Sequence, residues 1–354
     1  MYTKIQFEPE PENGFYITLR KRVNFYFEQN NTYRYANTQA KAKALLFVSF
    51  LVSTYLIIIF SNLPYFAVLI LWFLMGVFLI LSAMSIVHDA AHGTFSPIPW
   101  VNQLLLFFAN LAGGDGYMYK YKHVISHHPY TNIYGLDIDL EQSGFVRITP
   151  FSKTEGQHKY QSIYMKLLYP FYILFWVLIR DFKYYRLDKI GPVKPRHSAI
   201  QWIVLIVSKI FYLFYMLVIP YWMLPYAFWQ IVCGFIFMHI GSGLVAMVSL
   251  LSNHVVEDSY FFMPSEDGLI RSSWAEHQLR TTDDYSPDSK FISYLFSSLN
   301  HHTAHHLFPN FNHIHYPAIT KILRTTALEF GLQYRFHSLL GGLKSHFKLL
   351  KAMQ

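Results

Sequence analysis

Residues 44–92 read ALLFVSFLVSTYLIIIFSNLPYFAVLILWFLMGVFLILSAMSIVHDAAH, and this stretch decides the fold. It contains two apolar runs, residues 44–63 and 64–87, that carry no Lys, Arg, Asp or Glu. Each run reaches the roughly 20 residues that a helix needs to cross a hydrocarbon core of about 30 Å. Only a short turn separates the runs, so the sequence predicts a transmembrane helical hairpin that ends at a pair of histidines.

A second pair of apolar runs follows at residues 199–219 and 226–251, and the connecting residues 220–225 again lack charge. Over the whole chain only 14% of the residues are charged, whereas a soluble domain carries about a quarter. Residues 1–43 are polar and show no secretory signal pattern. The sequence therefore predicts an all-α integral membrane protein whose four transmembrane helices form two hairpins.

Nearly all the basic charge lies on the N-terminal arm, the middle loop and the C-terminal region. Positively charged loops stay on the cytoplasmic side, so we expect these regions and both termini to be cytoplasmic, at the inner membrane if the source is bacterial. No recognition motif accompanies the net charge of +8, and we expect no nucleic-acid partner. The chain reads as one domain, 1–354, with a cytoplasmic helical cap that holds two metal ions. Its predicted parts are the N-terminal arm (1–43), the first hairpin (44–87), a region with the first two histidine clusters (88–198), the second hairpin (199–251) and a region with the third cluster (252–354).

Three further features bear on the topology. Lys209 lies inside the third apolar run, where an ammonium at mid-membrane is costly, and we expect it near the cytoplasmic end of the span. Residues 104–112 and 167–179 are also apolar, but the second stretch is short and contains Pro170. If it crossed the membrane, the third histidine cluster would be separated from the first two. We therefore expect both stretches to be interfacial or re-entrant helices.

Three histidine clusters lie just outside the apolar runs, in the motifs HDAAH, HVISHH and HHTAHH. Helical positions i and i+4 share one face, so each motif can aim two imidazoles the same way. Neutral imidazole suits Zn, Cu, Fe and Ni, and the single cysteine excludes a cysteine-ligated iron–sulfur cluster. A structural zinc site needs four ligands, whereas nine suit two ions. The nine candidate ligands are His88, His92, His123, His127, His128, His254, His302, His305 and His306.

The other histidines fit a packing or capping role better than metal binding. His301 reads as a spare beside the third cluster, and five more read as structural: His158, His197, His239, His337 and His346. Three acids could hold ligand imidazoles in orientation through the second ring nitrogen, although a solvated carboxylate fits the pattern equally well. These acids are Asp89, Asp137 and Asp139.

The three motifs, with YKHVISHHPYTN at 121–132 and HHLFP at 305–309, resemble those of the integral-membrane fatty acid desaturases. The likeness extends from about residue 20 to residue 334 and is closest to the bacterial acyl-CoA or acyl-lipid branch related to the front-end desaturases. It implies that the nine histidines, His254 included, bind two irons. It also implies that part of WAEHQLRTT lines the substrate pocket or supports the ligands. The residues concerned are Trp274, His277, Gln278 and Thr282.

The chain departs from the cytochrome b5-fused members at His302, where those enzymes have Gln, and it shows no haem-binding His-Pro-Gly-Gly motif. The resemblance therefore implies a separate electron donor, such as ferredoxin or cytochrome b5. The expected reaction introduces a cis double bond into a fatty acyl chain, linked to CoA or to a membrane lipid, with O2 and two external electrons. Two alternatives stay open: a related di-iron lipid hydroxylase or ketolase, and a metal transporter, which would carry polar residues along its spans.

Overall fold

The computed structural model describes residues 5–140 and 144–354, so the first four residues of the predicted N-terminal arm lie outside it. The chain forms two compact units. Unit 1 contains residues 1–35, 122–163 and 248–354, and unit 2 contains residues 36–121 and 164–247. Because the chain passes between the units four times, neither unit is a continuous part of the sequence. The predicted single domain stays a prediction.

Unit 2 consists of helical segments. They are α2 (Thr38–Phe60), α3 (Tyr65–Ala91), α4 (Pro99–Leu106), α5 (Phe108–Leu111), α6 (Gly116–Lys120), η5 (Tyr169–Phe171), α8 (Tyr172–Phe175), η6 (Trp176–Arg180), α9 (Asp181–Tyr185), α10 (Ala199–Leu213), η7 (Phe214–Val218) and α11 (Ile219–Met223). Three segments begin in one unit and end in the other. They are η1 (Tyr121–His127), α7 (Gln161–Leu168) and α12 (Phe228–His254).

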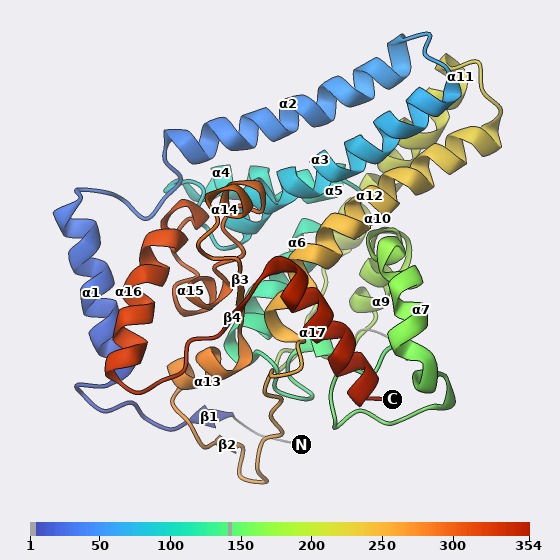
Figure 1. Ribbon diagram of the computed structural model, residues 1–354. Helices are drawn as coiled ribbons and strands as arrows, with labels where there is room; N and C mark the ends of the chain where they lie inside the picture. Colours follow the sequence, from blue (N-terminus) through green and yellow to red (C-terminus); the bar gives the residue numbers. More distant parts are fainter. Residues whose placement is uncertain (1–4, 141–143) are drawn as a thin grey trace. The chain divides into compact units, whose positions relative to one another are not determined.

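The two longest helices that lie wholly in unit 2, α2 and α3, run side by side as the predicted hairpin (Figure 1). The Asn37 side chain caps α2 by accepting a hydrogen bond from the backbone N–H of Ala40. Within the same unit, Gly76 of α3 lies against α12. A Cβ at this position would be only 1.8 Å from the carbonyl oxygen of Met238, so only glycine allows this approach. Close helix packing thus depends on one residue without a side chain.

Unit 1 combines short helices with two pairs of short strands. Its elements are β1 (Gln6–Phe7), α1 (Phe15–Gln29), η2 (His128–Tyr130), η3 (Ile138–Leu140), η4 (Gly156–Tyr160), β2 (Leu269–Ile270), α13 (Trp274–Thr281), β3 (Asp284–Tyr285), α14 (Lys290–Leu295), α15 (His302–Leu307), η8 (His313–His315), α16 (Tyr316–Glu329), β4 (Phe336–His337) and α17 (Leu339–Ala352). Strand β1 pairs in parallel with β2, and β3 pairs in parallel with β4.

The core of unit 1 lies where α1 and α16 run side by side (Figure 1). Leu19 and Val23 on α1 and Ile319 and Leu323 on α16 are fully buried, at a spacing of four residues on each helix. This is the stripe that an amphipathic helix presents to a core. The same apolar cluster includes Leu307 at the end of α15, so the short helix that carries the third histidine cluster is seated on this core.

Among the residues that the structure describes, five helical stretches, one more than the four predicted spans, are long and apolar enough to cross a membrane. Four correspond to the predicted spans, and the fifth is Gly156–Tyr185. The argument that residues 167–179 are too short for a span is therefore wrong, because the helical stretch extends beyond the apolar residues at both ends. Pro170 does not stop it, because the 3₁₀ turn η5 (Tyr169–Phe171) replaces regular α-helix at that point. Residues 104–112 are helical as predicted, in α4 and α5.

The position of Lys209 near the end of a span stays a prediction, but its side chain has a partner that the sequence did not indicate. Helix α10 begins at Ala199, well before Lys209, and the lysine side chain is buried. Its Nζ lies 2.6 Å from a carboxylate oxygen of Asp181, itself fully buried, and also donates to the carbonyl of Gly113. The charge is thus compensated inside unit 2. Nothing in the sequence pairs these two residues, because they come from different helical stretches.

Candidate metal centre

Four imidazoles of unit 1 converge from three separate parts of the chain. They belong to His127, His254, His302 and His306, and one ring nitrogen of each lies within 4.8 Å of the others. His127 ends η1, His254 ends α12, and the remaining two lie on α15. All four are predicted ligands, and we refer to them as the first imidazole group. The structure therefore brings His254 together with members of the second and third clusters.

The Nδ1 atoms of His127 and His254 each face an acceptor. His127 Nδ1 lies 3.0 Å from a carboxylate oxygen of Asp137, and His254 Nδ1 lies 2.9 Å from the carbonyl oxygen of Thr281. A carboxylate or carbonyl oxygen only accepts hydrogen bonds, so each Nδ1 must carry the hydrogen. The lone pair of each ring is then on Nε2.

The same arrangement holds for His302 and His306 on α15. His302 Nδ1 lies 3.1 Å from the carbonyl oxygen of Leu299, and His306 Nδ1 lies 2.9 Å from the side-chain amide oxygen Oε1 of Gln278. A ring N–H fixed in this way sets both the tautomer and the ring orientation, which is how proteins prepare histidines that bind metals.

The Nε2 atoms of the first imidazole group lie close together, and none carries a hydrogen when the rings are neutral, because each ring hydrogen is on Nδ1. The Nε2 atoms of His254 and His302 are 2.7 Å apart, and those of His127 and His254 are 3.2 Å apart. His306 Nε2 is buried and has no hydrogen-bond partner among the described residues. Two nitrogens that each sit about 2.1 Å from one ion would lie roughly 3 Å apart. The donor set therefore fits a transition-metal ion.

The surroundings shift the pKa values of His306 and His127 in opposite directions. Burial lowers the pKa of His306 well below its usual value, and the neighbouring imidazoles lower it further. Burial also lowers the pKa of His127, but the Asp137 carboxylate outweighs it and holds that pKa above its usual value. A metal takes a ring nitrogen only after its proton has left, so a bound cation would replace the proton, and the Asp137 carboxylate would make the His127 ring a stronger donor to it.

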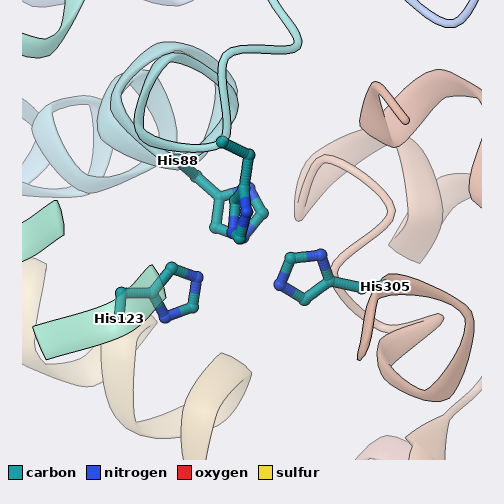
Figure 2. A group of neighbouring side chains, drawn as sticks. His88, His123 and His305 are labelled. Atoms are coloured by element: carbon teal, nitrogen blue, oxygen red, sulfur yellow. The ribbon is translucent and has the colours of Figure 1, made fainter. Parts of the chain in front are cut away.

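His123, His128 and His305 form a second meeting point in unit 1. His123 and His128 have their Nε2 atoms 3.3 Å apart, and one nitrogen each of His128, His305 and His306 lies within 4.8 Å of the other two. Figure 2 shows the rings of His123 and His305, which are nearly parallel with centroids 5.7 Å apart. His306 thus belongs both to the first imidazole group and to the set that it forms with His128 and His305.

His305 is oriented by a phenol. Its Nδ1 lies 2.9 Å from the hydroxyl oxygen of Tyr316, which in turn donates to the carbonyl of Phe311 at 2.8 Å. Because the tyrosine hydrogen is used on that carbonyl, the His305 ring must donate from Nδ1. Its Nε2 therefore carries the lone pair, as in the first imidazole group.

The first histidine cluster lies in unit 2, at the end of α3. His88 and His92 point from the same face, with ring centroids 5.0 Å apart, as the i and i+4 spacing predicted. His88 is buried and is also labelled in Figure 2. Its Nδ1 is 3.5 Å from a carboxylate oxygen of Asp89, too long for a well-formed hydrogen bond.

Asp137 and Asp139 have separate partners. Asp137 accepts hydrogen bonds from His127 Nδ1 and from the backbone N–H of Asn132 at 2.9 Å. Asp139 lies 2.8 Å from Lys122 Nζ, and its distance to His127 is 3.7 Å. Asp137 therefore orients the imidazole, while Asp139 forms an ion pair beside it.

A sequence profile of the family described as fatty acid desaturase matches residues 62–338. The chain belongs to the fatty acid desaturase family. The sn-1 linoleoyl-lipid 6-desaturase of Arthrospira platensis is 31% identical, covering 96% of this chain and 92% of that protein. The protein of the same name from Synechocystis is 29% identical, covering 97% of this chain and 96% of that protein. An acyl-lipid (8-3)-desaturase of Mortierella alpina is 30% identical, covering 92% of this chain and 74% of that protein.

The resemblance drawn from the histidine motifs is thus confirmed, and with it the fatty acid desaturase function. The desaturase is an oxidoreductase with several apolar helices suited to a membrane. Its histidine groups suit a metal site.

The WAEHQLRTT motif of the desaturase has divided roles. Gln278 contacts a predicted ligand directly, and His277 donates from Nε2 to the carbonyl of Thr131 at 2.7 Å. Thr282 lies 3.3 Å from the hydroxyl of Thr303, beside His302. Trp274 packs against Tyr16 of α1, with ring centroids 5.4 Å apart. Its contacts are those of a core residue.

Two residues that orient the site were missed by sequence reasoning. Tyr316 holds His305, and Asp284 accepts both the backbone N–H and the hydroxyl of Thr303, at 2.8 and 2.9 Å. Asp284 thereby fixes the start of α15. An acid pair directly after WAEHQLRTT was the available signal for Asp284, whereas no pattern pointed to Tyr316.

The histidines read as structural lie outside the histidine groups found in the described ranges. Most have an ordinary partner. His239 bonds to the hydroxyl of Tyr212 at 2.9 Å, His346 donates to the carbonyl of Val255 at 2.7 Å, and His301 lies 3.0 Å from the hydroxyls of Ser293 and Thr320. The remaining contacts are those of His158 with the carbonyl of Gly144, His197 with the hydroxyl of Tyr117, and His337 with Asp283.

Proposed function

We propose that this desaturase binds two iron ions through its nine histidines and uses O2 to place a cis double bond in an acyl chain carried by a membrane lipid. The observation that carries the proposal is the first imidazole group, whose Nδ1–H donors are all occupied and whose Nε2 atoms converge. The remaining histidines would hold the second ion. They are His88, His92, His123, His128 and His305.

Bound iron, reduced by a separate donor protein, would supply an oxidant strong enough to act on an unactivated methylene group, which no side chain can do. The balance per double bond is one O2, two external electrons and two protons, with two substrate hydrogens leaving in two waters. The chain's own residues would orient the imidazoles so that Nε2 faces the ion, as Asp137 and Tyr316 do through Nδ1. They must also exclude water and fix one carbon pair of the acyl chain.

A lipid-linked substrate is proposed because the relatives from Arthrospira and Synechocystis are named as linoleoyl-lipid desaturases and match nearly the whole chain. Linkage to CoA is the alternative. Basic residues could hold the phosphate of either one. A pulse of labelled fatty acid distinguishes them: the labelled double bond should appear in extracted glycerolipids before it appears in the acyl-CoA pool, and the reverse order would contradict the proposal.

The function is tested by expression in a host that lacks the product, with gas chromatography of total fatty acids. A new unsaturated acid should appear and should be lost in His305→Ala. The matched control is His158→Ala, which removes a buried histidine outside the histidine groups and should keep the product. Hydroxylated or keto acids in place of the unsaturated one would contradict the desaturation step. Zinc without iron in active protein would contradict the metal assignment.

For the membrane, we propose that the spans are α2, α3, α10 to α11, and α12, with both termini and all histidine clusters on the cytoplasmic side. An even number of crossings keeps the clusters on one side, so the fifth stretch, Gly156–Tyr185, would lie along the membrane surface.

The test replaces Cys233 with alanine and places a single cysteine at Lys189. A thiol reagent that cannot cross the membrane should label it only after the cytoplasmic side is opened.

A further inference from the structure

Helix α13 (Trp274–Thr281) carries none of the nine predicted ligands, yet it contacts segments of unit 1 that do. Toward the second histidine cluster, His277 donates to the carbonyl of Thr131 at 2.7 Å, and the Gln278 amide nitrogen donates to the carbonyl of His128 at 3.0 Å. Both donors and both carbonyls are buried. The backbone that follows the HVISHH motif is therefore fixed from α13.

Helix α13 also contacts two of the other predicted ligands. The Thr281 carbonyl accepts from His254 Nδ1 at 2.9 Å, and Gln278 Oε1 accepts from His306 Nδ1 at 2.9 Å. Gln278 thus joins the second cluster to the third through one side chain. It is fully buried, so water does not compete for these bonds.

The chemistry at Gln278 calls for an amide. The His128 carbonyl can only accept, so it faces the NH2 group, and this turns Oε1 toward His306. The Thr131 hydroxyl oxygen lies 3.2 Å from the same Oε1 and 3.1 Å from His306 Nδ1, and its single hydrogen has the carbonyl of His127 as a closer acceptor at 3.0 Å. A hydrocarbon side chain would offer neither contact. A carboxylate would keep the acceptor but place a negative charge against the His128 carbonyl.

His306 is the imidazole that both sets share. It belongs to the first imidazole group and also to the set formed with His128 and His305. A ring in this position could turn toward either of the proposed ions. The hydrogen bond from His306 Nδ1 to Gln278 removes that freedom. The position of Nε2, which has no partner among the described residues, then depends on the amide behind it.

We propose that Gln278 is a positioning residue that fixes His306 as an Nε2 ligand and sets the spacing between the second and third histidine clusters. The proposal rests on the proposed di-metal centre. Residues that hold a metal-binding histidine through its other nitrogen change metal affinity by about 10- to 100-fold when they are replaced. Gln278 is expected to show an effect of this size without touching the metal.

The test uses the full chain in detergent and measures iron affinity by competition with a chelator, together with Mössbauer spectra of the bound iron. Gln278→Met keeps the length of the side chain and removes both hydrogen bonds. It should lower the affinity for iron at least tenfold and alter the spectrum of one of the two irons. Gln278→Glu keeps the acceptor for His306 and should retain more iron than the methionine variant.

The matched control is Gln161→Met. Gln161 is also a fully buried glutamine of unit 1, with bonds to the backbone N–H and carbonyl of Arg147 and to the carbonyl of Leu350. The Gln161→Met variant should have a lower unfolding temperature than wild type but an unchanged iron affinity per folded molecule. The proposal is overturned if Gln278→Met binds iron as tightly as wild type, or if Gln278→Glu loses as much iron as Gln278→Met.

The wild-type protein separates this proposal from the proposed function. If it holds two irons and the methionine variant matches it, only the role of Gln278 fails. If it holds another transition metal, the iron assignment fails, and the same comparison is made with that metal. If it binds no metal at all, both proposals fall together.

Discussion

A histidine that binds a metal needs one ring nitrogen fixed so that the other can face the ion. Unit 1 meets this need with different acceptors at different ligands. His127 has a carboxylate, His254 and His302 have backbone carbonyls, and His305 has a phenol. These acceptors differ in strength, so the imidazoles will differ in how much electron density they give an ion.

The carboxylate at His127 gives the first prediction. Asp137→Asn should lower metal affinity about 10- to 100-fold, because an uncharged amide is a weaker acceptor and must also replace two backbone contacts. Asp139→Asn should have a smaller effect, since its carboxylate is 3.7 Å from His127 and pairs with Lys122. Metal titration of both variants checks this. Equal losses would show that the two acids act as one charge.

Spacing in the sequence marked the candidate ligands, but it pointed to only some of the groups that hold them, such as Asp137 and Gln278. His88 and His92 share a helix face because four residues separate them, and such a pattern is visible without a structure. The acceptor of His254 is a backbone carbonyl at Thr281, and the acceptor of His305 is Tyr316. A backbone carbonyl leaves no mark on residue type, and one tyrosine among 27 is no signal.

At the scale of elements, the third histidine cluster sits on a helix too short to be stable alone. Helix α15 has six residues, and isolated helices below about 12 residues are marginal in water. Asp284 fixes its first turn through the backbone N–H and hydroxyl of Thr303, and it also accepts from Tyr334 at 2.5 Å. The position of three predicted ligands, His302, His305 and His306, therefore depends on one buried acid.

Asp284→Ala is expected to lower the free energy of unfolding. Each buried donor left without a partner costs about 1–3 kcal/mol, and Asp284 serves three donors. Asp284→Asn keeps one acceptor oxygen, so its free energy of unfolding should lie between those of Asp284→Ala and wild type. Unfolding of the protein in detergent measures the difference. Asp288→Ala is the control, because its ion pair with Arg324 is exposed and should be worth at most about 1 kcal/mol.

The apolar runs predicted the long helices, since length and hydropathy decide whether a stretch can span a membrane. They did not predict the length of Gly156–Tyr185, where polar residues extend the helical stretch beyond its apolar part. A hydropathy argument measures only the apolar part. It also cannot foresee that the 3₁₀ turn at Pro170 keeps the stretch continuous.

On the scale of the whole molecule, unit 2 keeps an ion pair inside its apolar interior. Lys209 and Asp181 are both buried and 2.6 Å apart. Taking both charges out of water is costly, so such a pair adds little stability, yet removing one partner leaves an uncompensated charge. The pair therefore specifies which helices meet more than it strengthens their contact.

Lys209→Met should destabilise the protein by about 3–5 kcal/mol, whereas Lys209→Met combined with Asp181→Leu should recover most of the loss. Unfolding in detergent of the single variants, the double variant and wild type gives the coupling between the two residues. A double variant that is less stable than both single variants would show that the residues act independently.

Unit 1 contains buried histidines that are neutral in the folded protein at neutral pH. Burial lowers the pKa of His277, His301 and His346 to about 4 each. In the unfolded chain a histidine titrates near 6.5, so the unfolded state binds more protons between these values and stability falls as the pH decreases. The unfolding temperature should thus drop between pH 6.5 and pH 4.

His346→Gln, which cannot take up a proton, should weaken this pH dependence by up to about 1.4 kcal/mol per pH unit. Comparing wild type and variant over the same pH range, both without metal, removes the contribution of the metal ligands. An unchanged slope would mean that His346 is already exposed to protons in the folded state.

The first imidazole group draws on residues from 127 to 306, and this fixes the order of events during biosynthesis. A nascent chain that has reached residue 300 already contains both predicted hairpins and can enter the lipid, yet it lacks two of the four imidazoles. Binding energy for a metal is available only once its ligands are assembled. We therefore expect the proposed irons to be loaded after membrane insertion, so that a cell short of iron would accumulate finished, inserted apoprotein that a later supply of iron can activate.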